Sequence, residues 1–280
     1  MTNSFLFGTV GSPLSTPSKP GGTIGAINQI HQLGLQALEL GWVRSVRISE
    51  EACAQIKATA KELDISISIH APYFINLNAT DEEWINSRKR LMDAAYFGYL
   101  AGATDIIFHP GSSFGAPPDE WKKIVIERLA GCANELKEQE IIVTLRPETM
   151  GKQALIGSLQ DTLMLSQEIP GVEPCLDFAH LHARTGNGML NSEEEWDNCI
   201  VEYQQALGDE ALKRLHIHLS GIEYTEKGEK KHLPLEESDL NYKDLLKVLS
   251  DHKCGGRILC ESPIMEDDAL LMQTAMRELQ

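Results

Sequence analysis

The chain has 280 residues, of which 42% are apolar and 24% are charged, as is typical of a soluble globular protein long enough to bury a large core. No apolar run approaches the ~20 residues of a membrane span, which excludes a membrane-spanning helix from the interpretation. The formal net charge of −16 argues against a nucleic-acid partner, because phosphate binding relies on Lys and Arg, although bound divalent cations would offset acidic ligands.

Short β-branched runs alternate with longer amphipathic segments along the whole chain. Eight runs are predicted to be strands: 5–10, 37–40, 65–70, 105–109, 141–146, 173–177, 215–219 and 257–261. Helices are predicted from the N-cap Ser49 through Ala60, and over 81–101, 119–136, 193–207, 242–249 and 267–279. Segments 12–23 and 222–237 have the composition of long loops.

Eight strand-then-helix units without a linker predict one α/β domain over residues 1–280, a closed (β/α)8 TIM barrel. An open doubly wound sheet is the alternative. No G-x-G-x-x-G fingerprint follows the first strand, which disfavours that alternative. In a barrel, the long loops that follow strands belong to the functional face.

The six cysteines lie far apart and form no C-x-x-C pair, so neither a disulfide framework nor a structural zinc knuckle is expected. The N-terminus, MTNSFLFGTV, has no basic segment of the kind that opens a secretory signal. Reduced thiols and no leader predict a cytoplasmic protein. We expect it to be a monomer with no membrane partner.

Ligand-type side chains collect at the predicted strand ends. Seven of the nine histidines lie at or just beyond one: His70, His109, His180, His182, His216, His218 and His232. Glu148, Asp177 and Glu261 hold equivalent places, whereas His31 and His252, which lie within or at the ends of helical segments, are assigned structural roles. A carboxylate at the end of a buried strand is costly unless it is paired or bound to a metal.

This convergence predicts a shared metal centre at the barrel mouth. Nitrogen and oxygen ligands without thiolate suit Zn²⁺, and Mn²⁺ or Fe²⁺ would also fit. The number of ligands is sufficient for two or three ions. Clusters of this kind activate water for in-line displacement at phosphorus.

Several motifs resemble one family of barrel enzymes. They are HAPYFINL from His70, FHPGS from Phe108, LDFAH from Leu176, HL from His218 and ESP from Glu261. With them, the chain from about Phe5 to its end resembles endonuclease IV, the apurinic/apyrimidinic endonuclease of the xylose-isomerase-like barrel superfamily. The resemblance implies a trinuclear zinc site and a role in base excision repair, in which damaged double-stranded DNA is hydrolysed 5′ to abasic sites.

The resemblance also implies roles for individual residues. His70 and His109 correspond to ligands of the first zinc, Glu148 to the bridging carboxylate, and Asp177, His218 and Glu261 to the rest of the second site. His180 and His232 correspond to ligands of the third zinc, and Tyr73 and Phe74 to side chains that wedge into bent DNA. Glu148, Asp177 and Glu261 are the expected catalytic carboxylates. Phosphate contacts are expected from Arg44, Arg47, Arg184, Lys227, Lys230 and Lys231.

The chain departs from the family pattern in three places. The spacing puts Lys230 where the carboxylate of the third zinc is expected, two residues before His232, so this metal is predicted to be absent, weak or held by another residue such as His182. Thr149-Met150 replaces the usual Asn-Thr, and Ser220-Gly221 replaces Asn-Asp. These departures indicate a divergent branch.

The alternative function is a sugar isomerase or epimerase of the same superfamily. Such enzymes hold one divalent metal with Glu, Asp, His and Glu from four strands, and Glu148, Asp177, His218 and Glu261 fit that set equally well. A non-catalytic binding protein is the third possibility, which the intact first two sites disfavour.

Overall fold

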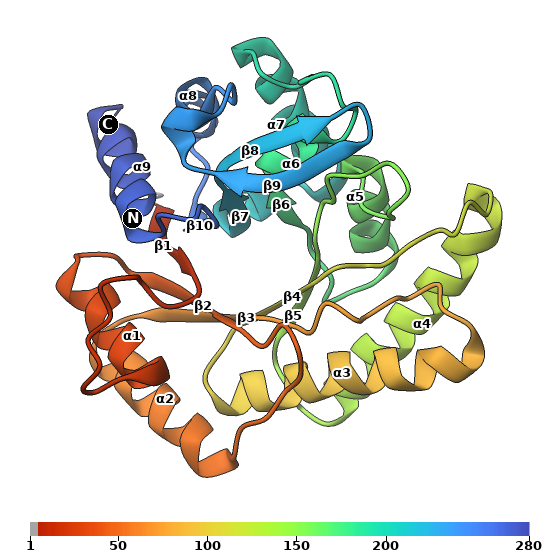
Figure 1. Ribbon diagram of the computed structural model, residues 1–280. Coiled ribbons are helices and arrows are strands. Elements are labelled where there is room, and N and C mark those ends of the chain that lie inside the picture. The colour runs from red at the N-terminus through yellow and green to blue at the C-terminus, as the bar shows by residue number, and fades with distance from the viewer. Residues whose placement is uncertain (1–4, 280) are drawn as a thin grey trace.

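The computed structural model of the chain describes residues 5–279. Its centre is a parallel eight-stranded sheet, in the order β5-β4-β3-β2-β1-β10-β7-β6 (Figure 1). The strands are β1 (Phe5–Val10), β2 (Ala37–Gly41), β3 (Ser66–His70), β4 (Asp105–Phe108), β5 (Thr144–Pro147), β6 (Cys175–Asp177), β7 (Leu215–Leu219) and β10 (Gly256–Cys260). Parallel bridges between Leu145 and Val172 and between Glu148 and Cys175 join the two ends of the sheet. The predicted TIM barrel is therefore confirmed.

Helices surround the sheet and cover its outer face (Figure 1). They are α1 (Gly22–Gln32), α2 (Glu50–Glu62), α3 (Asp81–Leu100), α4 (Pro118–Glu138), α5 (Leu159–Glu168), α6 (Phe178–Ala183), α7 (Glu193–Leu207), α8 (Tyr242–Asp251) and α9 (Glu266–Glu278). Short 3₁₀ helices span Asp209–Lys213 and Leu235–Glu237. No helix within residues 5–279 combines the length and the apolarity that crossing a membrane requires.

The eight predicted strands are all present, with ends within three residues of the prediction. The six predicted helices are present too, and Ser49 caps α2 by accepting the N–H of Ala52 at 3.2 Å. Helices α1, α5 and α6 were not predicted. α6 has only six residues, too few to show a helical period in the sequence.

The prediction of a long loop over residues 222–237 is wrong for most of that segment. It contains an antiparallel hairpin, β8 (Gly221–Thr225) and β9 (Gly228–Leu233), which packs against α6 (Figure 1). β9 has the sequence GEKKHL, whose charged side chains hide the alternation that marks a strand. The hairpin therefore brings His232 back over the barrel.

Apolar side chains between sheet and helices form the core, whereas the barrel interior is polar. At its lower end, the buried carboxylate of Asp105 pairs with Arg146 and, at 3.0 Å, with Arg257. One layer higher, Glu39 accepts from Ser68 at 2.9 Å. Every second side chain of a strand points into the barrel, so the inward side chains of neighbouring strands form successive layers. The carboxyl ends of the strands lie at the barrel mouth.

Candidate metal centre

Glu148, the residue after β5, lies between two groups of histidines. Its Oε2 atom is 3.3 Å from Nε2 of His70 and 3.2 Å from Nε2 of His109. Its Oε1 atom is 3.2 Å from Nδ1 of His180 and 3.7 Å from Nδ1 of His218. Because each oxygen faces a different group, this carboxylate is placed to bridge two cations.

The ligand-type side chains form three adjoining groups, in each of which the candidate ligand atoms lie within 4.8 Å of one another. The groups are His70, His109 and Glu148; Glu148, Asp177, His218 and Glu261; and Asp177, His180 and His232. The structure thus brings together all eight residues that the sequence predicts as ligands. All of them except Asp177 and His218 line a cavity of about 170 Å³, together with Tyr73, Met150 and Glu229.

The charges at this site fit a cation. Burial raises the pKa of Asp177 to about 8, and the neighbouring Glu261 and Glu148 add to the rise although His180 opposes it. Within the part of the chain that the structure describes, Oε1 of Glu148, Oδ2 of Asp177 and Nδ1 of His218 have no hydrogen-bond partner. Buried polar atoms are normally paired, and divalent cations would satisfy these.

Backbone and hydroxyl groups fix the orientation of three of the histidines. Nδ1 of His70 lies 3.0 Å from the Ala71 carbonyl, and Nδ1 of His180 lies 2.9 Å from the Thr149 carbonyl. Nδ1 of His232 lies 2.7 Å from the hydroxyl of Ser220. In each ring, Nε2 is left to face the cavity, the arrangement found in metal-binding histidines. Ser220, a departure from the family pattern, therefore supports a candidate ligand.

The structure corrects the assignment of Lys230 to the third site. A bulge between Glu223 and Tyr224 shifts the hairpin register, so that Lys231 pairs with Glu223, Glu229 pairs with Tyr224, and Lys230 is the extra residue. Lys230 turns outward to Glu223, whereas Oε2 of Glu229 lies 3.1 Å from Nε2 of His180. The carboxylate expected two residues before His232 stands three residues before it. The sequence contains Glu229, but the bulge that turns it inward leaves no clear signal there.

His182, the other residue considered for the third site, lies outside the three groups. Its ring is fully buried, with Nε2 3.1 Å from Oδ1 of Asp239 and Nδ1 3.2 Å from the Met189 carbonyl. Tyr224 packs edge-on against it. His182 therefore ties α6 to the hairpin and to the segment before α8.

Glu39 was not predicted as a site residue, yet it lies beneath the centre on β2. Its Oε2 atom is 2.9 Å from Nε2 of His216, and its Oε1 atom is 3.1 Å from Nε2 of His218. Burial by itself would raise the pKa of Glu39, but His218 and His216 hold it well below its ordinary value. The carboxylate is thus charged and orients His218, whose Nδ1 faces the cavity. A glutamate inside the apolar run ALELG was the available signal.

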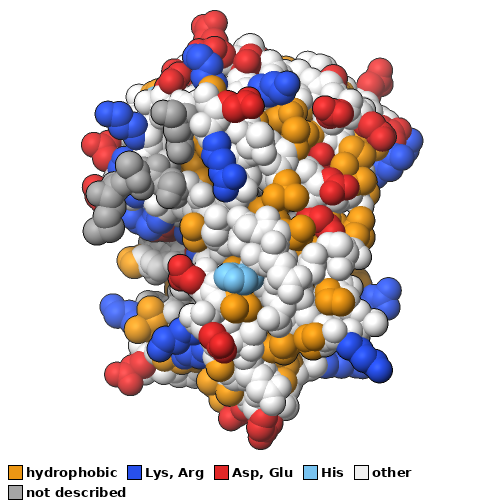
Figure 2. Space-filling model, turned by 90° about the vertical axis from the view of Figure 1, so that its left-hand side faces the viewer, with side chains coloured by type: hydrophobic (Ala, Val, Ile, Leu, Met, Phe, Trp, Pro, Cys, Tyr) orange, Lys and Arg blue, Asp and Glu red, His pale blue; other side chains and the backbone are white. Residues whose placement is uncertain are grey.

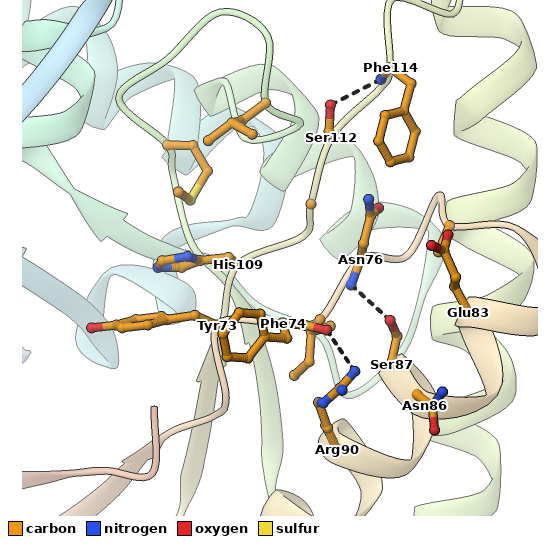
Figure 3. Close-up of a pocket in the computed structure, with 15 residues that line it drawn as sticks. Tyr73, Phe74, Asn76, Glu83, Asn86, Ser87, Arg90, His109, Ser112 and Phe114 are labelled. Atoms are coloured by element: carbon orange, nitrogen blue, oxygen red, sulfur yellow. Dashed lines mark hydrogen bonds between the residues drawn. The ribbon is translucent and has the colours of Figure 1, made fainter. Parts of the chain in front are cut away.

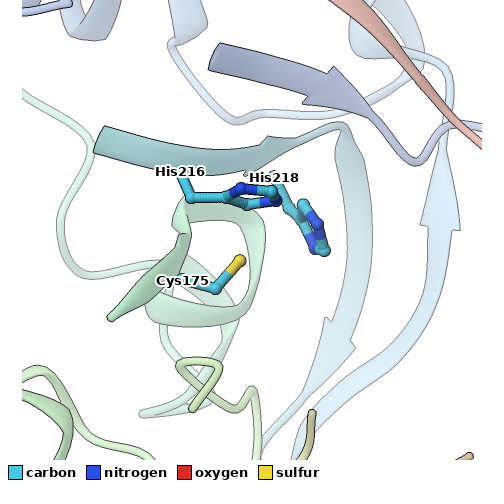
Figure 4. A group of neighbouring side chains, drawn as sticks. All are labelled: Cys175, His216 and His218. Carbon is cyan, nitrogen blue, oxygen red and sulfur yellow. The ribbon is translucent and has the colours of Figure 1, made fainter. Parts of the chain in front are cut away.

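Cys175, His216 and His218 form a further cluster inside the barrel (Figure 4). Burial raises the pKa of the Cys175 thiol well above its ordinary value and lowers the pKa of His216 to about 4. Because both histidines already contact Glu39, this cluster supports the centre above it.

The residues predicted to contact substrate lie around the mouth of the barrel. Tyr73 stacks on His109, with ring centroids 5.1 Å apart, and Phe74 is exposed. Arg44 is exposed on the loop after β2, beside Val43, whose carbonyl accepts the Tyr73 N–H at 3.0 Å. Lys230 lies outside the ligand groups, as described above. The roles of these four residues in binding substrate stay predictions.

Arg184, another residue that was expected to contact phosphate, instead binds the protein's own backbone. Arg184 donates to the carbonyls of Met150, Lys152 and Leu155, so its guanidinium holds the loop after β5. On the side of the molecule shown in Figure 2, the described Lys and Arg side chains lie interspersed with Asp and Glu.

A family model described as xylose isomerase-like TIM barrel matches residues 27–280. A protein of Methanocaldococcus jannaschii, named only as uncharacterized, is 37% identical over 275 residues, which cover 98% of this chain and 97% of that protein. A probable endonuclease 4 of Enterococcus faecalis is 31% identical over 172 residues, which cover 58% of this chain and 54% of that protein. The match to the endonuclease relatives thus spans only about half of their length.

Solved structures share the fold. Endonuclease IV from Thermus thermophilus superposes with a TM-score of 0.74 at 21% identity, over 97% of this chain and 98% of that chain. A D-tagatose 3-epimerase-like protein gives a TM-score of 0.69 at 16% identity, over 91% and 92% of the two chains. At these identities the likeness shows the barrel, which enzymes of both kinds use.

Proposed function

The chain belongs to the xylose isomerase-like TIM barrel family, and from that premise we propose that it is a metal-dependent phosphodiesterase of the endonuclease IV type. Its proposed substrate is damaged double-stranded DNA, cut 5′ to abasic sites in base excision repair. Zn²⁺ is the proposed cofactor, with Mn²⁺ or Fe²⁺ as alternatives. We propose that it acts in the cytoplasm as a monomer.

The observation that carries this proposal is the third ligand group. An epimerase that holds one metal needs only the group of Glu148, Asp177, His218 and Glu261. Four more histidines would then have no ligand role: His70 and His109 on one side, and His180 and His232 on the other. Backbone or hydroxyl groups nevertheless orient three of these four rings toward the cavity. Glu229 beside His180 adds a carboxylate to the third group.

The donor set fits two or three divalent cations. Bound there, such ions supply a nucleophilic water at neutral pH and neutralise charge on the phosphate. His70, His109 and Glu148 would hold one ion, Glu148, Asp177, His218 and Glu261 a second, and His180, His232 and Glu229 a third. Zinc favours such mixed imidazole and carboxylate sites.

The protein's own groups position the reactants. Glu148 is fully buried, so its two oxygens stay fixed between the groups that they face. Glu261 is partly exposed, and its Oε2 atom lies 3.6 Å from Nε2 of His232, so it can accept a proton at the cavity surface. The ring of Tyr73 packs edge-on against His70 and stacks on His109, which holds both imidazoles in place.

A sugar isomerase or epimerase is the second candidate. The four-residue group around Glu148 is complete, and the barrel resembles solved epimerases as well as an endonuclease. A phosphate-free sugar would leave the first and third groups unused.

The test uses the full chain reconstituted with zinc or manganese and a duplex that carries one tetrahydrofuran abasic analogue. We expect a single nick on the 5′ side of the analogue, and none with Glu148→Gln. If the wild-type protein leaves this duplex intact yet epimerises a ketohexose, the epimerase is the correct function. Nicking that persists with Glu148→Gln would show that a contaminant cut the DNA.

A further inference from the structure

A cavity of about 590 Å³ opens between the loop after β3 and the loop after β4 (Figure 3). Tyr73, His109 and Met150 line both this cavity and the smaller one at the metal centre. The two cavities therefore adjoin across these three side chains. A molecule whose phosphate lies at the metal centre would extend its next group into the larger cavity.

Two exposed aromatic rings line the cavity. The side chains of Phe74 and Phe114 are 64% and 69% exposed, so neither ring is packed into the core. Arg90 holds Phe74 in place: its guanidinium lies 5.9 Å from the ring centroid and donates to the Phe74 carbonyl at 3.0 Å. A ring that is fixed but uncovered is suited to stacking against a flat ligand.

Phe114 sits in an unfavourable backbone conformation. Its φ of 53° lies in the left-handed region, which bulky side chains rarely adopt. The hydroxyl of Ser112 accepts the Phe114 N–H at 3.0 Å and stabilises the turn (Figure 3). Strain of this kind is retained where a side chain must be presented in one direction. Here the direction is out of the core and along the cavity wall.

The remaining wall comes from α3 and is polar. Asn86 is exposed, and no hydrogen bond of its amide occurs among residues 5–279. The amide of Asn76, in contrast, accepts the Asn78 N–H at 2.9 Å. A free amide offers one acceptor and two donors, which match the hydrogen-bonding edge of a nucleobase.

We propose that this cavity binds one unstacked nucleobase, that of the nucleotide next to the cleaved phosphodiester. The base stacks on Phe114, the more exposed of the two rings, and places its edge near Asn86. This inference rests on the proposed function, since the metal centre must hold the phosphate. A duplex releases a base most readily beside a missing one, where one stacking partner is lost. The cavity therefore favours damaged over intact DNA.

The test measures binding and cleavage separately. The probe is a duplex with a tetrahydrofuran residue flanked by 2-aminopurine, with a phosphorothioate at the cleavable bond for the binding titration. We expect zinc-loaded wild-type protein to change the 2-aminopurine fluorescence. We expect Phe114→Ala to weaken binding roughly five- to a hundredfold and to diminish that change. Asn86→Ala should alter the preference among flanking bases.

The matched control is Ile142→Ala, which removes a side chain that is 81% exposed and lies outside the cavity lining. It should bind and cut like the wild type. If Phe114→Ala binds as tightly as Ile142→Ala and changes the fluorescence equally, the cavity does not hold a base, even where both proteins nick DNA. If the wild type does not nick the unmodified duplex, the proposed function itself fails, and this inference fails with it.

Discussion

Glu229 and His180 approach to 3.1 Å, although they lie on different elements and Glu229 stands one position before the residue that spacing alone selects. The bulge at Lys230 produces this contact. An extra residue in one strand reverses which side chains face inward on either side of it. Glu229 and His232 can therefore face the same cavity, as lining residues of the metal centre.

We predict that Glu229→Gln weakens the third metal site without unfolding the protein. Its carboxylate faces His180 and also accepts the Gly151 N–H at 3.1 Å, a bond that glutamine can retain. In a titration with zinc against a competing chelator, the weakest of the bound ions should lose affinity. The control is Lys230→Ala, which removes the outward-facing side chain. If Lys230→Ala changes zinc affinity and Glu229→Gln does not, the bulge has been misread.

Glu39→Gln should lower zinc affinity by about 10–100-fold. A glutamine amide can donate to Nε2 of His218, which moves the ring proton to Nδ1, the atom that faces Glu148 and Glu261. Chelator competition measures this loss. The exposed Glu62→Gln serves as control. Equal affinities for the two variants, with equal melting temperatures, would remove Glu39 from its positioning role.

Asp105→Asn should destabilise the barrel by about 3–5 kcal/mol, because it leaves Arg146 and Arg257 buried without their shared counter-charge. Asp81→Asn is the matched control. Asp81 pairs with Arg128 at 2.7 Å but is fully exposed, so its loss should cost far less. Urea unfolding at neutral pH compares the two variants. If both variants lose a similar amount of unfolding free energy, the buried ion pairs of Asp105 stabilise the protein no more than the exposed pair of Asp81.

The buried carboxylate of Asp105 also predicts how the free energy of unfolding changes at acidic pH. Burial would raise the pKa of Asp105, but Arg146 and Arg257 hold it well below its ordinary value. When the pKa of a carboxyl is lower in the folded than in the unfolded protein, the group stabilises the fold at every pH above the unfolded-state pKa. That stabilisation is lost as the pH falls from the unfolded-state pKa toward the folded-state pKa. The wild type should therefore lose more unfolding free energy than Asp105→Asn below about pH 4. Parallel acid profiles of the two proteins would contradict this.

The sequence was sufficient for the barrel and for the ligands that end its strands. Parallel strands deliver their last residues to one rim, so His70, Asp177 and Glu261 could be grouped without coordinates. Glu39 and Glu229 could not be grouped with them in this way. The role of Glu39 depends on its place in the layer beneath the rim, and that of Glu229 depends on the bulge in the hairpin. Such relationships between distant residues leave no periodic signal.

The cavity beside the centre was hidden for a similar reason. Phe74 was predicted to contact DNA because of the resemblance, whereas Phe114 belongs to a loop with no strand or helix pattern. Its exposure and its positive φ become visible only in three dimensions.

The most direct test of the multinuclear centre is the number of zinc ions bound per folded chain, measured by elemental analysis after reconstitution and removal of free metal. Three ligand groups sharing Glu148 and Asp177, with Glu229 completing the third, predict three ions per wild-type chain. A value of one would contradict the account and favour a sugar epimerase that holds its metal with Glu148, Asp177, His218 and Glu261 alone.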